Sequence, residues 1–383
     1  MSAPGARAPV AALPAERVVA RVDLGAVERN CALLKSRLRG AALCAVVKAD
    51  GYGHGAVPCA NAALAGGATW LAVATAREAA ELREGEATGR LLVMGALTSA
   101  ELEVALEADA DVVAWTPEFL ALAASQAAAA GRPARIHVKF DTGMGRLGTK
   151  STHDVLALLE QAEREDALEA VGVMTHFATA DEADRGYLEQ QLDRFRSVAK
   201  EAKEALPALV VHAANSAAVL AEPATHFDMA RCGVAIYGLD PFQRDPREQG
   251  LEPALALESY VAAVKPFAPG ESAGYGRTWT APTETFVGTL PVGYGDGYRR
   301  GLSNAAELLI RGRRYPLVGT VSMDNVTVDL GTDSDIQPGE RATLIGSQGG
   351  ERVLAEELAH TLGTINYEIT CGLTSRIPRR YDE

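Results

Sequence analysis

The sequence predicts an α/β protein in which a closed barrel of eight parallel strands, surrounded by helices, precedes a smaller and mostly β domain. Three observations support this prediction. Short apolar runs alternate with amphipathic segments between about residues 42 and 240. Polar side chains recur where these runs end, and beyond about residue 249 the helical periodicity gives way to β-type runs separated by glycine. Alternation of strands and helices is typical of parallel strands covered by helices.

The apolar runs of the first part are short enough for strands and are bounded by turn-forming residues. They are Leu43–Val47, Trp70–Ala74, Leu91–Met94, Asp111–Trp115, Ile136–Phe140, Ala170–Thr175, Leu209–His212 and Val234–Tyr237. Amphipathic segments between them predict helices, among them Ala76–Arg83, Pro117–Ala130 and Tyr187–Lys203. Eight such strands indicate a (β/α)8 barrel of the TIM type. An open doubly wound sheet is the alternative, although no GxGxxG turn supports it.

The chain changes character after Asp240. The segment Pro241 to Pro253 is polar and contains prolines, which is typical of a linker. The β-type runs beyond it are Leu257–Val264, Thr285–Leu290, Glu307–Ile310, Tyr315–Val318, Val326–Leu330 and Ala342–Ile345, with a helix predicted at about Val353–Leu362. We therefore expect a barrel domain over residues 1–248, with a frayed arm at 1–17, and a mostly β domain over 249–383.

Composition excludes several classes of function. A formal net charge of −13 over 383 residues repels nucleic acids and anionic membrane surfaces, so neither is expected as a partner. The five cysteines are scattered without CxxC spacing, which argues against a disulfide framework or a metal site. From the residues at the N-terminus we expect neither a signal peptide nor a membrane anchor. We expect a cytoplasmic globular protein with a small-molecule substrate.

Functional side chains are expected at the carboxyl ends of the barrel strands. Lys48 directly follows the first apolar run, where an amine shielded by apolar walls can lose its proton and attack a carbonyl carbon, as in Schiff-base formation. A lysine in this position also commonly extends into solvent. Arg146 follows the fifth run within a glycine-rich loop, and its planar guanidinium suits a carboxylate or a phenolate, although a solvated loop arginine is equally expected from that position alone.

Two further strand ends carry polar residues. His176 follows the sixth run, where a histidine is more often a hydrogen-bonded core residue than a catalyst. Asn215 and Ser216 follow the seventh run, where such residues usually cap a helix and where backbone N–H groups can also meet a phosphate.

The longer strings around these positions resemble those of the bacterial alanine racemases. The similarity extends from about Arg21 to Arg379 and so covers nearly the whole chain. The strings are AVVKADGYGHG at 45–55, DTGMGRLG at 141–148, MTHF at 174–177, HAANS at 212–216, MARCGVAIYG at 229–238, AGYGR at 273–277, GYGDGY at 293–298, GTVSMD at 319–324 and NYE at 366–368. Ser322 stands where many members of the family carry a cysteine.

The resemblance implies a pyridoxal 5'-phosphate enzyme of fold type III. Lys48 would hold the cofactor as a Schiff base, and the other cofactor-binding positions would be Tyr52, His176, Asn215, Ser216, Arg231, Gly233, Val234 and Tyr367. Arg146, Met323 and Asp324 match residues near the substrate carboxylate. Lys139 matches a lysine that is carbamylated in many members. Arg231 matches an arginine that faces the pyridine nitrogen, where a fixed cation disfavours protonation of the ring and suppresses side reactions such as transamination.

The resemblance further implies a reaction with two bases on opposite faces of the substrate. Tyr275 would serve L-alanine and Lys48 would serve D-alanine, with Tyr275 acting in the partner's site of a homodimer that shares its active sites. An ordinary tyrosine, with a pKa of about 10, is a poor base, so neighbouring cations would have to lower that pKa. A role in supplying D-alanine for peptidoglycan follows from this activity.

Three alternatives remain open at this point. The first is a racemase for serine or another small amino acid. The second is a related decarboxylase, although a decarboxylase should lack the paired Arg231 and Tyr275 signatures. The third alternative is a non-catalytic pyridoxal-phosphate carrier. Such carriers usually consist of the barrel alone, so a β domain with a candidate base argues against that reading.

Overall fold

The computed structural model describes residues 14–382, and these separate into two compact units. One unit is Leu24–Pro253, and the other combines residues 14–23 with residues 254–382. The division expected from the sequence, 1–248 and 249–383, differs because it groups the N-terminal segment with the barrel. None of the helices in the described part of the chain is both long enough and apolar enough to cross a membrane.

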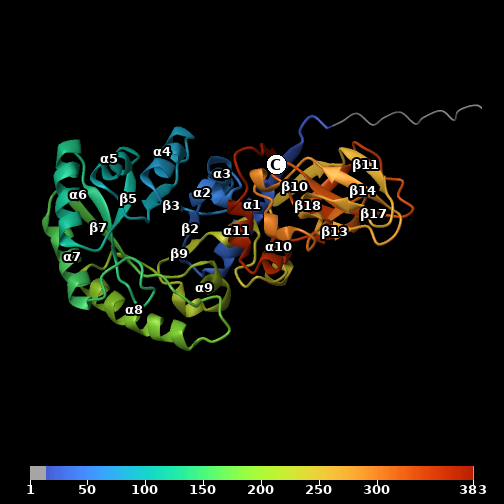
Figure 1. The fold of residues 1–383 in the computed structure, drawn as a ribbon. Helices are drawn as coiled ribbons and strands as arrows, with labels where there is room; N and C mark the ends of the chain where they lie inside the picture. The colour runs from blue at the N-terminus through green and yellow to red at the C-terminus, as the bar shows by residue number, and fades with distance from the viewer. Residues whose placement is uncertain (1–13, 383) are drawn as a thin grey trace, which may run out of the picture. The chain divides into compact units, whose positions relative to one another are not determined.

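Within the described residues, eight parallel strands of the first unit close into a barrel in which each strand pairs with the next in sequence and the last pairs with the first (Figure 1). The strands are β2 (Ala42–Val46), β3 (Trp70–Val73), β4 (Arg90–Val93), β5 (Ala110–Ala114), β6 (Ala134–Lys139), β7 (Leu168–Met174), β8 (Val210–His212) and β9 (Met229–Cys232). The predicted barrel is therefore confirmed, and seven of its eight strands lie within two residues of the predicted bounds.

Helices connect the strands and cover the outside of the barrel, as α4 to α8 show in Figure 1. They are α1 (Leu24–Arg37), α2 (Lys48–Tyr52), α3 (Ala56–Ala65), α4 (Ala76–Glu84), α5 (Ser99–Glu107), α6 (Pro117–Ala130), α7 (Thr152–Arg164), α8 (Gly186–Ala205) and α9 (Ser216–Ala221). Their starts follow local sequence signals. Thr75 and Thr98 each form a capping box with a glutamate three residues later, and Thr116 caps α6 ahead of a proline in its first turn.

The eighth strand differs from the prediction. The segment Val234–Tyr237, predicted as a strand, is a 3-10 helix, and the strand is instead β9, which lies five residues upstream. All four residues of β9 are buried, and they include Arg231, so the strand presents no continuous apolar run. At Gly233 the backbone turns away with φ −107° and ψ −91°, which ends the strand and begins the helix.

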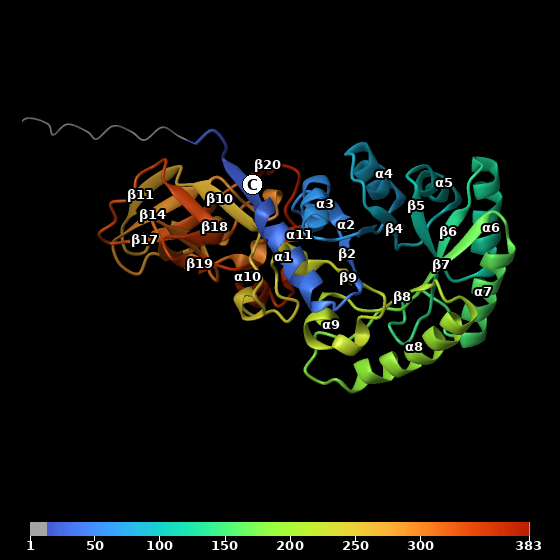
Figure 2. The ribbon, with the colours of Figure 1, turned by 180° about the vertical axis from the view of Figure 1, so that it is seen from behind.

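The second unit consists mainly of antiparallel strands in three sheets (Figure 2). A seven-stranded sheet contains β1 (Val18–Asp23), β10 (Leu255–Tyr260), β15 (Glu307–Ile310), β16 (Arg313–Pro316), β18 (Arg341–Gln348), β19 (Glu351–Val353) and β20 (Arg379–Asp382). The smaller sheets contain β11 (Ala263–Phe267), β14 (Thr285–Leu290) and β17 (Val326–Gly331), and β12 (Ser272–Ala273) and β13 (Trp279–Thr280). Two helices follow β19, namely α10 (Ala355–Leu362) and α11 (Asn366–Cys371).

Long-range pairing decides where these strands begin and end. The run predicted as one strand, Leu257–Val264, is two strands in different sheets. The chain changes sheets where Val261 N–H donates to the carbonyl of Glu340 and Ala262 N–H to that of Thr289. Strand β1 was not predicted, and it lies between β10 and β20 in the large sheet.

The N-terminal arm was expected to fray over residues 1–17, and residues 1–13 of it lie outside the described residues. Arg17, by contrast, is held in place. Its Nη1 donates to Asp296 Oδ2 at 2.9 Å and to the carbonyl oxygen of Pro291 at 2.9 Å. Asp296 is buried and also accepts from the N–H of Gly293, so this ion pair fixes the start of β1 within the second unit.

Two glycines with nearly the same backbone conformation provide a test of the packing at the end of the barrel unit. Gly238 has φ +72°, and a Cβ atom there would lie 1.7 Å from the carbonyl oxygen of Glu252, whereas Gly131 has φ +70° and open space. We expect Gly131→Ala to lower the free energy of unfolding by about 1 kcal/mol through the left-handed backbone alone. Gly238→Ala should cost several times as much because backbone atoms overlap. Thermal unfolding midpoints at equal protein concentration compare the two, and equal midpoints would contradict the close approach.

Candidate active site

The barrel brings most of the candidate residues to one end. Lys48 and His176 each lie two residues beyond the end of a strand, namely β2 and β7. Lys139 is the last residue of β6, and Arg231 lies in β9. Asn215 and Ser216 follow β8. Because the carboxyl ends of parallel barrel strands meet at the same rim, these side chains share one end of the barrel.

An unusual turn carries Lys48. The residues that follow it, Ala49, Asp50, Gly51 and Tyr52, all have left-handed backbone conformations with φ between 51° and 60°. Such conformations cost free energy for residues other than glycine and cluster at functional sites. Glu78 helps to hold the turn, since its Oε1 accepts from Ala49 N–H at 2.6 Å while its other oxygen belongs to the capping box of α4.

Arg231 is only 3% exposed, and its guanidinium is anchored on all sides. Nη2 donates to the carbonyl oxygens of Thr175 at 2.7 Å and Ala213 at 3.1 Å. Nη1 lies 2.8 Å from His212 Nδ1, and Nη2 lies 3.3 Å from His176 Nδ1. Burial lowers the pKa of Arg231 to about 10, so the side chain still carries its charge at neutral pH.

Positive charge accumulates around this arginine. Lys139 is 5% exposed, and burial, followed by the charges of Arg231, Arg146 and Lys48, lowers its pKa to about 8 against the partly compensating charge of Asp141. Burial and the same cations hold the pKa of His176 well below its ordinary value, which keeps this imidazole neutral. The end of the barrel is therefore an electropositive site suited to an anionic ligand.

Hydrogen bonds to Asp141 and Tyr187 hold the loop that carries Arg146 in place. The carboxylate of Asp141 accepts the N–H groups of Gly143 at 3.0 Å and Gly145 at 3.0 Å. Tyr187 of α8 donates its hydroxyl to the carbonyl of Gly143 at 2.8 Å, and a Cβ at that glycine would lie 2.3 Å from the same hydroxyl. Arg146 itself lies exposed on this fixed loop.

A small polar recess lies at the ends of β8 and β9. The hydroxyl of Ser216 accepts from the N–H of Gly233 at 3.0 Å, while the side chain of Asn215 caps α9. A Cβ on Gly233 would lie 2.3 Å from the hydroxyl oxygen of Tyr52, so only glycine leaves room for that hydroxyl. Val234 continues from Gly233 into the 3-10 helix. Two hydroxyl groups and backbone N–H groups thus converge, which is suitable for a phosphate.

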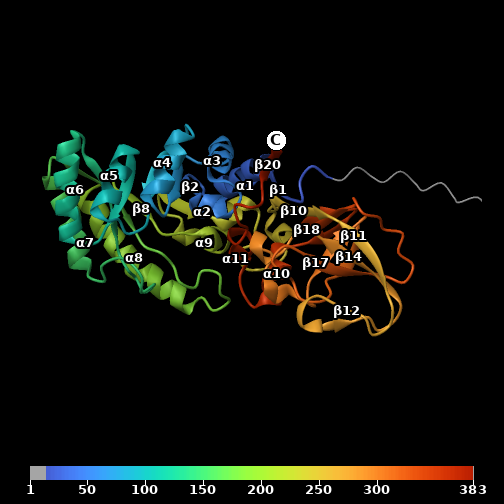
Figure 3. The same ribbon diagram turned by 45° about the horizontal axis from the view of Figure 1, so that its top comes forward.

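The remaining candidates lie in the second unit. Tyr275 follows β12 and is 74% exposed, between two glycines with φ +74° and +73°. Figure 3 shows β12 and its turn at the periphery of this unit. The carbonyl of Tyr275 accepts from the hydroxyl of Thr320 at 2.8 Å, which links it to the segment that carries Met323 and Asp324. Tyr367 lies in α11 of the same unit.

The loop that contains Tyr294 and Gly295 supports the segment of Met323 and Asp324. The N–H groups of Tyr294 and Gly295 donate to the carbonyls of Ser322 at 3.0 Å and Met323 at 2.9 Å. Arg376 Nη2 donates to Asp324 Oδ1 at 2.6 Å. The segment is therefore fixed, while 52% of the Met323 surface remains exposed.

Each unit also contains a supporting residue that the sequence did not single out. Gln191 of α8 donates to Thr142 Oγ1 at 3.0 Å and accepts from Ala178 N–H at 2.9 Å, so it joins the loops that follow β6 and β7. Arg376 was likewise missed. A glutamine on the apolar face of a predicted helix was a visible signal for the first residue, whereas nothing local marked the arginine.

Comparison with known proteins extends this picture. The sequence model described as alanine racemase, N-terminal domain, matches residues 22–241, and that of the alanine racemase C-terminal domain matches residues 254–381. The chain belongs to the alanine racemase family. The predicted resemblance is thus confirmed over nearly the whole sequence.

Individual alanine racemases are similar in sequence to this chain over nearly its whole length. The protein of Symbiobacterium thermophilum is 43% identical over 363 residues, covering 94% of this chain and 96% of the relative. Alanine racemase 1 of Bacillus subtilis is 40% identical over 367 residues, covering 95% and 92%.

Solved alanine racemase structures share the fold. The enzyme of the D-cycloserine producer Streptomyces lavendulae superimposes with a TM-score of 0.92 at 38% identity, covering 97% of this chain and 98% of that one. The alanine racemase of Bacillus anthracis, solved with bound L-Ala-P, gives 0.89 at 36% identity, covering 97% and 96%. Both domains of this alanine racemase family member therefore have experimentally observed counterparts.

The lowered pKa of Lys139 predicts how stability depends on pH. Because the folded pKa is about 8 against an ordinary 10.5, the unfolded chain binds more protons in between, and stability rises as pH increases through that window. We expect Lys139→Met to stabilise the protein most at neutral pH, by roughly 3 kcal/mol, and to lose this advantage near pH 10. Unfolding midpoints of both proteins in bicarbonate-free buffer measure the effect.

Parallel pH profiles of the two proteins in that buffer would contradict the account. Repeating the comparison with added bicarbonate tests the modification that the resemblance implies, because a carbamate on Lys139 no longer carries a titrating amine.

Proposed function

We propose that this chain interconverts L-alanine and D-alanine with pyridoxal 5'-phosphate, using Lys48 and Tyr275 as its two bases. Family membership supports the reaction. The observation that carries the proposal is the cluster of Lys48, Arg146 and Arg231 around one electropositive barrel end, since their charges act together on Lys139. The cofactor supplies an aldehyde that reacts with amines and a ring that withdraws electrons from the adjacent carbon.

The residues present fit this cofactor. Its phosphate matches the recess formed by Tyr52, Ser216 and Gly233, where the absent Cβ of the glycine leaves space against the tyrosine hydroxyl. We assign Asn215, Val234 and Tyr367 to the same group on the strength of the family. The cationic cluster matches the negative charge of the cofactor as a whole, and His176 provides a neutral ring beside Arg231.

Lys48 and Tyr275 divide the proton transfers between them. Lys48 Nζ exchanges a proton with the α carbon on the face that yields D-alanine, and Tyr275 Oη exchanges one on the opposite face. Each group must be a base in one direction and an acid in the other. Cations favour the deprotonated form of a neighbouring amine, and burial, together with the charges of Arg231, Arg146 and Lys48, lowers the pKa of Lys139 at this end of the barrel.

Other residues hold the substrate in place. Arg146 suits the carboxylate of alanine because its guanidinium is exposed on a loop that Asp141 and Tyr187 keep rigid. Met323 and Asp324 approach the same carboxylate in our proposal. The ion pair of Asp324 with Arg376 offsets the negative charge of that aspartate, which would otherwise repel the substrate.

We further propose a homodimer in which each active site combines Lys48 of one copy with Tyr275 of the other. A tyrosine that is 74% exposed gains a function when another surface covers it, and Met323 is exposed on the segment bonded to the same turn. Symmetric pairing of two copies forms two such sites at once. A cytoplasmic location and a role in peptidoglycan supply remain predictions from the sequence and the family.

Substitution of the two bases tests the reaction. We expect Lys48→Ala to abolish racemisation and Tyr275→Phe to lower kcat with L-alanine by at least about a hundredfold, since general base catalysis supplies that much. Chiral chromatography of alanine and an absorbance spectrum of the bound cofactor provide the readouts. Tyr381→Phe, which changes an exposed tyrosine on β20, serves as the control and should leave kcat unchanged.

The same assay with L-serine tests the breadth of the substrate. A protein that binds the cofactor but converts no amino acid would contradict the proposed activity and favour a carrier. A protein that racemises serine and leaves alanine untouched would contradict the assigned substrate.

Co-expression of the two inactive variants tests the shared sites. A mixed dimer of Lys48→Ala and Tyr275→Phe chains has one site with both changes and one site with neither. Random pairing should therefore restore about a quarter of the parent activity, because half of the dimers are mixed and each has one intact site. No recovery in a mixture shown to contain mixed dimers would mean that both bases come from the same chain.

A further inference from the structure

A chain of buried polar side chains runs through the interior of the barrel, away from the proposed active site. It begins at Arg231, whose Nη1 lies 2.8 Å from Nδ1 of His212 at the end of β8. Nε2 of that histidine lies 2.8 Å from Nδ1 of His137 in the middle of β6. Nε2 of His137 lies 3.1 Å from Oδ2 of Asp111, near the amino end of β5. Both imidazoles and the carboxylate of Asp111 are completely buried.

The direction of every hydrogen bond in this chain follows from its two ends. A guanidinium has only donors, so Nδ1 of His212 must accept and its proton must lie on Nε2. That N–H donates to His137, which therefore also carries its proton on Nε2 and donates it to the acceptor-only carboxylate of Asp111. Both histidines are then neutral, in agreement with the lowered pKa that burial gives each of them. All the donors point from Arg231 toward Asp111.

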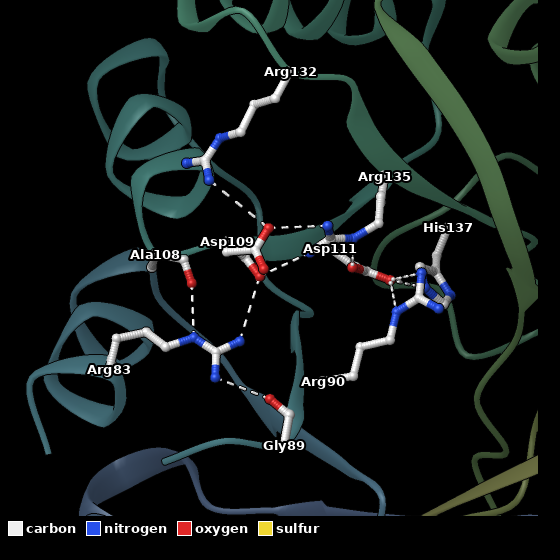
Figure 4. Close-up of polar contacts among 9 residues, drawn as sticks. All are labelled: Arg83, Gly89, Arg90, Ala108, Asp109, Asp111, Arg132, Arg135 and His137. Atoms are coloured by element: carbon white, nitrogen blue, oxygen red, sulfur yellow. Dashed lines mark hydrogen bonds and ion pairs between the residues drawn. The ribbon is translucent and has the colours of Figure 1, made fainter. Parts of the chain in front are cut away.

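The far end of the chain is held by arginines that open to solvent. Arg90 Nη2 lies 3.0 Å from Asp111 Oδ2, and Arg135 Nε lies 2.5 Å from Oδ1 (Figure 4). Burial alone would raise the pKa of the Asp111 carboxyl, but the hydrogen bond from His137 and the two guanidinium groups outweigh it and lower that pKa. Both arginines line an open hollow of about 390 Å³. The chain therefore ends in a clamped, ionised carboxylate.

The neighbouring strands leave room for this arrangement. Gly172 of β7 faces His137, and a Cβ atom there would lie only 2.3 Å from its Nδ1. Any larger residue would displace the imidazole from the line between His212 and Asp111. On the other side, the ring of Trp70 packs edge-on against His137 at 5.6 Å between ring centroids. The position of the imidazole is thus fixed by shape as well as by hydrogen bonds.

We propose that Asp111 is a positioning residue for the racemisation, acting on Arg231 through His137 and His212. The carboxylate fixes the direction of the hydrogen bonds, so that both imidazoles keep the tautomer in which His212 accepts from Arg231. Donation of its Nε2 proton to His137 makes His212 Nδ1 a stronger acceptor of the hydrogen bond from Arg231. This hydrogen bond fixes the orientation of Arg231 toward the cofactor. This inference rests on the proposed function, since it assigns Arg231 a place beside the cofactor.

The first test measures the protons themselves. In protein labelled with 15N-histidine, nitrogen shifts of the rings report which nitrogen carries the proton, and His137→Asn and His212→Asn assign the signals. We expect both His137 and His212 to be neutral with the proton on Nε2 at neutral pH. A proton on Nδ1 of either ring, or two protons on one ring, would contradict the proposed direction of these hydrogen bonds. This readout does not depend on activity, so it separates failure of the chain from failure of the proposed function.

The second test compares two aspartates that share Arg135. Asp109 is 57% exposed and pairs with Arg132 and Arg135, but not with His137 (Figure 4). We expect Asp111→Asn to lower kcat by about tenfold or more with little change in KM for alanine, and to shift the ring N–H signal of His137. Asp109→Asn should change neither. Equal losses in both variants, or an unchanged kcat in Asp111→Asn, would contradict the proposal.

A third variant covers the case in which Asp111→Asn folds poorly. In His212→Asn the amide oxygen still accepts from Arg231, but nothing reaches His137, so the chain is cut in the middle. The loss in kcat should match that of Asp111→Asn, and the double variant should be no slower than either single variant because both act on one pathway. Additive losses would show that Asp111 does not act through His212.

Discussion

The structure depends on keeping the guanidinium of Arg231 charged although it is buried inside the barrel. Burying a charge is costly unless hydrogen bonds and counter-charges replace its water. Arg231 meets this constraint with two backbone carbonyls at the ends of β7 and β8 and with an imidazole acceptor. Those carbonyls are available as hydrogen-bond acceptors only because the strands end at this level. The imidazole can accept a hydrogen bond from Arg231 in only one tautomer. The fold and the protonation states are therefore determined together.

The consequences extend to both ends of the barrel. At the carboxyl end, burial together with the charges of Arg231, Arg146 and Lys48 lowers the pKa of Lys139 and holds that of His176 well below its ordinary value. At the amino end, Asp111 is ionised because Arg90 and Arg135 clamp it. The barrel interior thus has cations next to the proposed chemistry and, at the opposite end, a carboxylate paired with two arginines. Such preorganised charge is the largest source of catalysis in many enzymes.

The sequence was sufficient for the parts of this account that depend on local pattern. Short apolar runs alternating with amphipathic segments predicted the barrel, and strand ends located Lys48, Arg146, His176 and Asn215, whereas Lys139 was indicated only by the resemblance. The eighth strand was misplaced because its buried residues include Arg231, so no apolar run marked it. The split of the run near Val261 and the pairing of β1 were not predictable locally. The split depends on contacts with Thr289 and Glu340, and β1 pairs with a strand more than two hundred residues away.

The polar chain shows a different limit. Asp111 and His212 lay inside predicted strands, and His137 interrupted an apolar run, so buried polar residues were visible as anomalies. Their mutual hydrogen bonds join residues 26 to 75 positions apart and appear only when the barrel closes. Tyr275 presents a related case, because its exposure in one copy gives no sign of a base. Only the resemblance to known racemases predicts the role that we propose for it.

The most direct test of the account follows the fate of L-alanine in deuterium oxide with the cofactor-loaded protein. If Arg231 keeps the ring from accumulating negative charge, the products should be an equal mixture of the two enantiomers with deuterium at the α carbon, and pyruvate should stay at trace level. Chiral chromatography with mass detection and a pyruvate assay measure both in one sample. Release of about one pyruvate per bound cofactor, with conversion of the cofactor to its amine form and no D-alanine, would contradict the central role of the buried cation.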